Sequence, residues 1–252
     1  MLDYGLYNMD CLVGMKYIAD KSIDMILCDL PYGTTRCHWD AIIPFDKLWE
    51  QYNRIIKDNG AIVLFGTEPF SSHLRLSNLK HYKYDWIWDK VKGTGFLNAK
   101  KQPMKNHEVI SVFYKKQCTY NPIKTQGHIK KKAFRRKHHQ TDVYGDMNND
   151  HLYESTERYP RSIQIFSTDT QKSTLHPTQK PLALCEYLIK TYTNEGDVVL
   201  DNCMGSGTTA IACMNTKRNF IGFELDEEYY KSASERLEGH TAQVSIFDFI
   251  ER

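Results

Sequence analysis

The 252-residue chain contains no long apolar run, and the longest ones, within residues 24–28 and 61–65, are only strand-length. A membrane-spanning helix needs roughly 18 apolar residues, so we expect a soluble protein with no membrane partner. The N-terminus lacks a basic start followed by an apolar stretch, and it lacks a small-residue cleavage site. We therefore predict that no secretory signal is present and that the protein is cytoplasmic.

Cysteine pairs of the Cys-x-x-Cys type are also missing. The seven cysteines are odd in number and widely spread, which argues against a zinc site and against a disulfide framework. We expect reduced thiols, several of them acting as small core residues, and no metal centre.

Acidic residues are missing from one stretch, because residues 115–139 hold nine Lys or Arg and no Asp or Glu. The net charge of the whole chain is only +2, so this positive charge is local. The overall composition, with 41% apolar and 25% charged residues, is that of a globular protein. It excludes a disordered tail and a disulfide-rich miniature domain.

Apolar periodicity predicts alternating strands and helices over most of the chain. The expected strands are residues 6–10, 24–29, 61–65, 84–88, 109–114, 197–201 and 220–224, and the expected helices are residues 11–19, 44–57, 178–192 and 208–215. Such alternation favours an α/β fold with a doubly wound, mostly parallel sheet covered by helices. Residues 91–106 are expected to form a long loop, and residues 115–174, which lack periodicity, an insertion.

A glycine-containing turn, Asp201-Asn-Cys-Met-Gly205-Ser-Gly207-Thr208, lies between a strand and a helix, and Glu224 ends the next strand. This arrangement favours a nucleotide-type cofactor, because glycines let a ligand approach the backbone and the acid bonds ribose hydroxyls. A plain tight turn and an NAD site remain alternatives. A phosphate-binding P-loop is excluded, since no Lys-Ser/Thr pair follows the glycines.

A second motif, Asp29-Leu30-Pro31-Tyr32, stands where a strand ends, and ligands bind at the carboxyl ends of strands in such sheets. Together with the glycine motif and with residues 176–181 (His-Pro-Thr-Gln-Lys-Pro), it resembles the S-adenosylmethionine-dependent DNA amino-methyltransferases, in the permuted, β-type group whose catalytic motif precedes the glycine motif. The resemblance covers nearly the whole chain outside residues 115–174.

The resemblance implies a seven-stranded, Rossmann-like methyltransferase sheet, S-adenosylmethionine as cofactor and double-stranded DNA as partner. It divides the chain into a catalytic and cofactor-binding domain, residues 1–114 and 175–252, and a DNA target-recognition insertion, residues 115–174. A homodimer and an associated restriction endonuclease are left open.

Motif matching assigns roles to individual residues. The resemblance places catalysis at Asp29, Leu30, Pro31 and Tyr32. It places cofactor binding at Asp10, Cys11, Asp29, Thr178, Lys180, Asp201, Cys203, Gly205, Ser206, Gly207, Thr208 and Glu224. Among these, Asp10 matches the carboxylate for the cofactor adenine and Glu224 the ribose-binding acid, while Thr178 and Lys180 would start a helix facing the methionine carboxylate.

The chain departs from the family pattern in two places. Leu30 stands where Pro is usual, which is tolerable because the backbone carbonyl is the expected acceptor. Asn202-Cys203 stands where Pro-Phe is commoner, so no aromatic contact with the cofactor is expected here. A nucleic-acid-binding module that has lost catalysis is therefore the rival function from another class.

The catalytic motif suits methylation of an exocyclic base amine, whose nitrogen lone pair is delocalised into the ring. The Asp29 carboxylate and the Leu30 carbonyl are expected to accept the amine N–H groups and to align the nitrogen with the cofactor methyl. The base must be flipped out of the duplex, and Tyr32 is expected to stack on it. In the family an Asp in the first position goes mostly with adenine N6, so we expect a site-specific adenine methyltransferase, with cytosine N4 as the alternative.

Basic residues in two segments are expected to contact DNA phosphates. They are Lys92, Lys130, Lys131, Lys132, Arg135, Arg136 and Lys137. A solvated charged loop is the alternative interpretation of residues 130–139. His107-Glu108 also resembles a family feature, but no role for it follows from the sequence.

Overall fold

The computed structural model describes residues 2–33, 41–133, 140–141, 145–146, 153–168 and 179–250. The chain divides into two compact units, residues 1–121 with 162–252, and residues Pro122–Arg161. The smaller unit is shorter than the insertion expected over residues 115–174, because the flanking segments bond to the larger unit. The Asn121 backbone N–H donates to the Thr191 carbonyl at 2.7 Å, and that of Phe166 donates to the Asp89 carbonyl at 3.1 Å.

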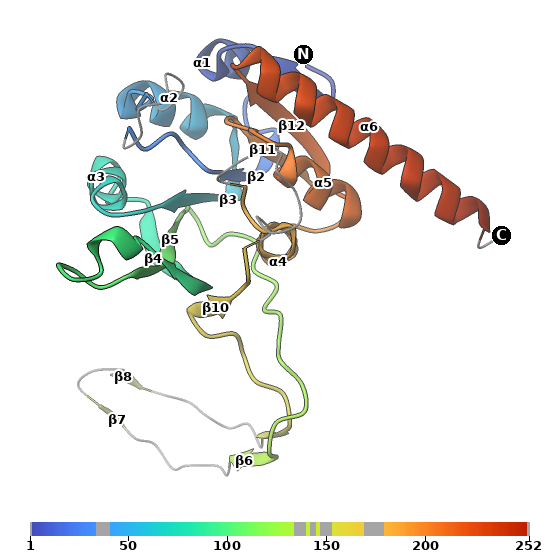
Figure 1. The fold of residues 1–252 in the computed structure, drawn as a ribbon. Coiled ribbons are helices and arrows are strands. Elements are labelled where there is room, and N and C mark those ends of the chain that lie inside the picture. The colour runs from blue at the N-terminus through green and yellow to red at the C-terminus, as the bar shows by residue number, and fades with distance from the viewer. Residues whose placement is uncertain are drawn as a thin grey trace. The chain divides into compact units, whose positions relative to one another are not determined.

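The larger unit is built on one sheet whose described strands lie in the order β1, β12, β11, β2, β3, β5, β4, β10 (Figure 1). In this order they span Gly5–Asn8, Asn219–Glu224, Val198–Asp201, Ile23–Cys28, Ile56–Gly66, Lys105–Phe113, Tyr82–Thr94 and Ile163–Ile165. β5 runs antiparallel to β3 and β4, and the other neighbouring pairs are parallel. The α/β class and the mostly parallel sheet are confirmed, and strands from both ends of the chain lie side by side.

Two details of the sheet differ from the expectation. The described sheet has eight strands rather than seven, because β10, from the segment expected to be an insertion, pairs with β4. Residues 91–106 are not a loop throughout, since β4 continues to Thr94, which pairs with Lys105 of β5. In both places backbone hydrogen bonds to a neighbouring strand hold a segment that is too short or too polar for its side chains to signal a strand.

Helices cover both faces of the sheet. One face carries α1 (Cys11–Gly14), the short 3₁₀ helix η1 (Met15–Tyr17), α2 (Phe45–Ile55) and α3 (Phe70–Ser77), and the other carries α4 (Leu182–Tyr192) and α5 (Thr208–Asn215). α6 (Glu227–Ile250) contacts β1, β12 and α5.

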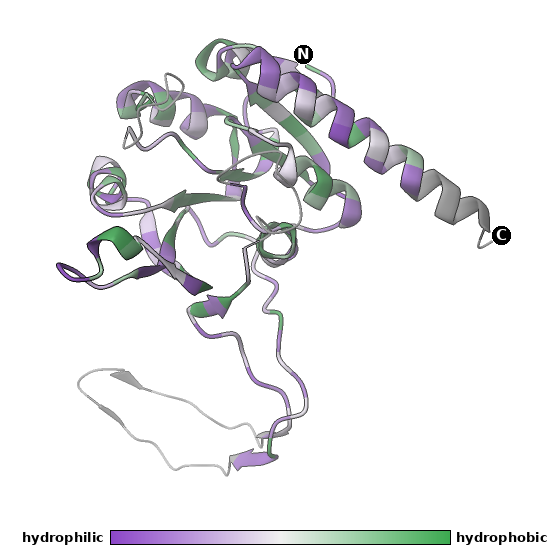
Figure 2. Cartoon of the chain, in the orientation of Figure 1, coloured by the Kyte–Doolittle hydropathy of each residue, from purple (hydrophilic) through white to green (hydrophobic). Residues whose placement is uncertain are grey.

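Successive side chains of β2 alternate between the two faces of the sheet, so this central strand packs against both layers of helices. Ile26 and Cys28 pack in the cluster that includes α2 and α3, whereas Met25 and Leu27 pack in the cluster that includes α4 and α5. A strand buried on both faces has a continuous apolar sequence, as residues 25–28 do. Figure 2 shows the hydrophobic colours gathered on the central strands and on α5.

The start of α4 also differs from the expected one near residue 178. Pro181 is the N-cap and the helix begins at Leu182, because a residue that precedes proline, here Lys180, is disfavoured in helical conformation. Over the described residues, no helix is both long and apolar enough to cross a membrane.

The smaller unit contains two short antiparallel strand pairs. β6 (Lys131–Ala133) pairs with β9 (Tyr153–Ser155), and β7 (Gln140–Thr141) pairs with β8 (Gly145–Asp146). Glu154 of β9 forms an ion pair with Lys130 and lies 3.6 Å from the Lys132 ammonium. Part of the positive charge predicted to meet DNA phosphates is therefore balanced by an acid of the same unit.

Candidate functional site

A cavity of about 800 Å³ lies where β1, β2, β11 and β12 end. Parallel strands present their carboxyl ends at one edge of a sheet, which brings together residues from both ends of the chain. Of the predicted site residues, the cavity is lined by Asp10, Cys11, Asp29, Leu30, Pro31, Tyr32, Lys92, Lys180, Asp201, Cys203, Gly205, Ser206, Thr208 and Glu224.

The glycine turn borders this cavity with exposed backbone. Gly205 and Gly207 have φ values of +53° and +77°, in the left-handed region that favours glycine. A Cβ atom on Gly205 would meet nothing within 4 Å, so open space lies beside its backbone. The Gly205 N–H donates to Glu224 Oε2 at 2.8 Å. The turn therefore has the open, acid-flanked form predicted for a cofactor site.

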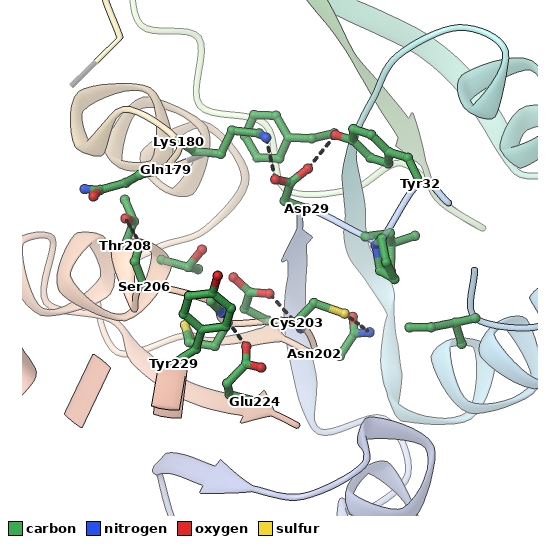
Figure 3. A pocket seen from close by; sticks show the side chains of 18 of the residues that line it. Asp29, Tyr32, Gln179, Lys180, Asn202, Cys203, Ser206, Thr208, Glu224 and Tyr229 are labelled. Carbon is green, nitrogen blue, oxygen red and sulfur yellow. Dashed lines mark hydrogen bonds and ion pairs between the residues drawn. The ribbon is translucent and has the colours of Figure 1, made fainter. Parts of the chain in front are cut away.

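Glu224 is held by the backbone on both carboxylate oxygens. Oε2 accepts from Gly205, and Oε1 accepts from the Asp226 N–H at 2.9 Å. Burial raises the pKa of the Glu224 carboxyl. Tyr229, in the first turn of α6, lies beside Glu224 at the cavity wall (Figure 3).

Arg236 of α6 supports the glycine turn, and the sequence alone does not single it out. Its Nη1 donates to the Ser206 carbonyl at 2.7 Å and to the Thr208 hydroxyl at 3.1 Å. The contact joins residues 28 to 30 positions apart, and no motif spacing signals it.

Asp29 stands at the other end of the cavity with both carboxylate oxygens in contact with donors (Figure 3). The Tyr32 hydroxyl donates to Oδ1 at 2.5 Å, and the Lys180 ammonium donates to Oδ2. The Tyr32 ring packs on Phe70, with the centroids 4.9 Å apart. Burial and the nearby Asp29 carboxylate raise the pKa of the Tyr32 hydroxyl well above its usual value. The tyrosine is thus neutral and acts as a donor.

Behind Asp29 the charges alternate along a chain of four side chains. The Lys180 ammonium lies 3.4 Å from Glu108 Oε2, and the Lys90 ammonium lies 2.7 Å from Glu108 Oε1. Lys180, Glu108 and Lys90 each expose less than 15% of the side chain, at 11%, 13% and 13%. Such buried charges need opposite partners to compensate their lost hydration.

The pKa values of this chain follow from the pairing. Burial disfavours the Lys180 charge, but the Asp29 and Glu108 carboxylates outweigh burial and raise the pKa of Lys180. Burial likewise opposes ionisation of Glu108, but Lys180 and Lys90 outweigh it and lower the Glu108 pKa. Glu108 and Lys90 are functional candidates whose role the sequence did not indicate, although His107-Glu108 was noted as a motif.

The Asn202-Cys203 departure has a structural reason in this chain. The Tyr52 hydroxyl donates to Asn202 Oδ1 at 2.5 Å, and Asn202 Nδ2 lies 3.6 Å from Cys11 Sγ and 3.5 Å from Cys203 Sγ. Asn202 is buried and held by α2 rather than left as an unpaired replacement. These contacts therefore hold the part of the cavity wall that Asn202 and Cys203 form.

Two further acids border the cavity. Asp201 is buried, and its Oδ1 accepts from the Cys203 N–H at 3.1 Å. Burial raises the pKa of Asp201 to about 6. Asp10 is the N-cap of α1 and accepts from the Val13 N–H at 3.0 Å. One Asp10 carboxylate oxygen thus caps α1, and Asp10 also lines the cavity.

The remaining predicted site residues are placed as follows. Gly207 is the N-cap of α5 and is not among the residues that line the cavity. Thr178, Arg135, Arg136 and Lys137 lie outside the described residues. Lys131 is in β6. Among the described residues, no group of three or more His, Cys, Asp or Glu side chains could hold a metal ion.

Comparison with known families and proteins bears on what this site does. A family model described as DNA methylase, N6_N4_Mtase, matches residues 23–235. The chain is 29% identical to type II methyltransferase M.HpaI of Haemophilus parainfluenzae, over 99% of this chain and 78% of that protein. It is 27% identical to DNA adenine methyltransferase YhdJ of Escherichia coli, over 91% of this chain and 81% of that protein.

A solved structure is similar over almost its entire length. The crystal structure of the M1.HpyAVI-SAM complex superposes with a TM-score of 0.62 and 27% sequence identity. The match covers 92% of this chain and 98% of that one.

Proposed function

The chain belongs to the DNA methylase family of N6/N4 methyltransferases, and we propose that it methylates the exocyclic N6 of adenine in DNA at the cavity described above. One observation carries this proposal. The same cavity is lined at one end by Asp29-Leu30-Pro31-Tyr32 and at the other end by Gly205 and Glu224. The first end suits an amine and the second suits a nucleoside.

The cavity fits S-adenosylmethionine as the methyl donor. Its volume of about 800 Å³ is within the range of ligand pockets, and the open backbone at Gly205 leaves room for close contact. Glu224 would accept from ribose hydroxyls, Asp10 and Cys11 would border the adenine, and Asp201, Cys203, Ser206 and Thr208 would line the remainder. When bound, the cofactor supplies an electrophilic methyl group.

The catalytic end has the acceptors that an amine needs. A carboxylate offers about four lone-pair sites, so Asp29 can accept an amine N–H while it keeps Tyr32 and Lys180 as donors. With the Leu30 carbonyl as second acceptor, the amine nitrogen turns its lone pair toward the methyl. The cofactor would supply the methyl group to this nitrogen, and the amine would then release a proton to solvent.

Lys180 has two candidate roles. The sequence motif matches it to the methionine carboxylate, whereas its ammonium in this structure faces Asp29 and Glu108. The affinity of a Lys180→Met variant for S-adenosylmethionine separates the two. A large loss of affinity supports cofactor binding, and an unchanged affinity with lost transfer supports an action on Asp29.

DNA is held, in this proposal, by Lys92 at the cavity and by the basic segment 130–137. The target adenine is flipped into the cavity at a cost of a few kcal/mol, because Asp29 cannot reach a base inside the duplex. The unit Pro122–Arg161 lies within the proposed target-recognition insertion, residues 115–174. Lys130 and Lys132 would have to exchange Glu154 for phosphate.

The test is transfer of tritiated methyl from S-adenosylmethionine to unmethylated genomic DNA, followed by mass spectrometry of the nucleosides. We expect N6-methyladenine. N4-methylcytosine would keep the reaction and overturn the base assignment, and DNA binding without transfer would favour the silent binding module. A homodimer and an associated restriction endonuclease rest on family resemblance alone, and light scattering and cleavage of unmethylated DNA test them.

A further inference from the structure

The hairpin formed by β4 and β5 ends in an exposed apolar tip. Residues Phe96–Asn98 form a short 3₁₀ helix, η2, in which Phe96 is 78% and Leu97 is 98% exposed. Val91 and Met104 on the two arms are also exposed. Two neighbouring large apolar side chains at the end of a hairpin do not contribute to the core, and such patches mark interaction sites.

The tip has a defined conformation that presents these side chains. Gly95 has a φ of +89°, which lets the chain turn at the end of β4. The Thr94 hydroxyl donates to the Lys105 carbonyl at 3.1 Å and joins the two arms. The Asn98 and Ala99 N–H groups donate to Gly95 and Phe96 carbonyls at 2.9 and 3.0 Å. Phe96 and Leu97 are therefore carried on a hydrogen-bonded turn.

The segment that carries the tip is basic. Residues 90–106 contain no Asp or Glu. The exposed lysines of this segment are Lys92, Lys100, Lys101 and Lys105. Apolar side chains framed by lysines complement a nucleic acid, in which stacked bases lie between negative phosphates. This charge pattern selects DNA over an apolar protein partner.

The position of the hairpin connects it with the cavity. Lys90, Lys92, Gly93 and Thr94 of the β4 arm line the same cavity as Asp29. DNA whose target base enters that cavity would thus lie against this hairpin. Extrusion of a base leaves a gap in the stack, and apolar side chains inserted between base steps are a known means of holding such distorted duplexes.

We propose that Phe96 and Leu97 form a wedge that enters the DNA stack beside the flipped base and stabilises the extruded state. This inference rests on the proposed function and adds residues that the catalytic motifs do not contain. Tip lysines hold the adjacent phosphates, and the wedge occupies the space that the base vacates. The wedge thereby acts on extrusion, whereas Asp29 acts on the amine.

The test compares two duplexes that contain the methylation site mapped from modified DNA. In the first the target base is paired, and in the second it lies opposite an abasic site, where extrusion costs less. For the Phe96→Ala, Leu97→Ala double variant, we expect kcat/KM to fall by about 10- to 100-fold on the paired duplex. On the duplex with the abasic site it should stay near the wild-type value. Cofactor affinity should not change.

A matched control uses Leu76 and Leu79, which are 70% and 63% exposed and are not among the cavity-lining residues. The Leu76→Ala, Leu79→Ala variant should match wild type on both duplexes. Equal activity of the tip variant and wild type on the paired duplex would overturn the wedge, and so would an equal loss on both duplexes. Failure of wild-type protein to methylate either duplex would instead overturn the proposed function.

Discussion

The two ends of the cavity are stabilised in different ways. At the glycine-turn end, Glu224 is held by the backbone N–H groups of Gly205, 19 residues before it, and of Asp226, 2 residues after it. At the Asp29 end, the carboxylate is held by side chains, Tyr32 and Lys180, and Lys180 is in turn held by Glu108. Backbone donors tolerate most substitutions, whereas a side-chain network fails when any member is removed. Mutations should therefore affect the two ends differently.

The largest effect should follow from removal of the acceptor at the reacting end. Asp29→Ala should lower methyl transfer by at least about 10²-fold, because the amine loses its charged acceptor. Cofactor affinity, measured by calorimetry, should change by less than a few-fold. Residual transfer near the wild-type rate would contradict the role of Asp29. Leu76→Ala serves as a surface control.

A smaller effect, on binding rather than on rate, is expected at the other end. Glu224→Ala removes the acceptor of two backbone N–H groups and of the proposed ribose contact. The dissociation constant of S-adenosylmethionine should rise roughly 10- to 100-fold, while kcat at saturating cofactor should stay within a few-fold of wild type. An unchanged dissociation constant would remove Glu224 from the cofactor site.

Disruption of the charge network of Lys180, Glu108 and Lys90 should lower kcat, by less than the loss of Asp29 does, and should leave cofactor binding unchanged. Glu108→Gln keeps the shape but leaves Lys180 and Lys90 without their shared carboxylate. We expect kcat to fall on the order of tenfold, because Asp29 is held less precisely, with no change in cofactor affinity. The exposed pair Lys47 and Glu50 supplies the control, since Glu50→Gln should change neither quantity. A purely structural Glu108 would lower the melting temperature and leave kcat unaltered.

The smallest effect concerns stability and pH. Because burial raises the Asp201 pKa from 3.8 to about 6, the folded state disfavours the ionised form. The stability that this carboxyl contributes is complete below about pH 4 and falls by up to roughly 3 kcal/mol as the pH rises through 6. Asp201→Asn should therefore gain stability relative to wild type between pH 4 and 7, as measured by urea unfolding. Parallel pH curves for the two proteins would contradict this.

The contrast between the ends also explains which site residues could be predicted. Gly205, Glu224 and Asp29 lie in short motifs, where the order of strand, turn and acid carries the signal. Arg236 supports the glycine turn from α6, and Lys90 meets Glu108 only because β4 pairs with β5. Such contacts depend on the register of strands and on helix packing. No local pattern encodes them.

The fold shows the same division. Buried strands with continuous apolar sequence, such as residues 25–28, were predicted because burial on both faces requires it. β10 and the extension of β4 to Thr94 were not predicted, since their hydrogen bonds come from neighbouring strands.

The amino-acid sequence by itself determined the α/β class, the family and the motif residues at the strand ends, because apolar periodicity and local turn chemistry are written in consecutive residues. Only the tertiary structure decided that Lys180 faces Asp29 and Glu108 and that Asn202 bonds Tyr52. It also decided that Phe96 and Leu97 stand at the tip of a hairpin that lines the cavity. These features depend on strand pairing and on close packing between residues distant in the chain.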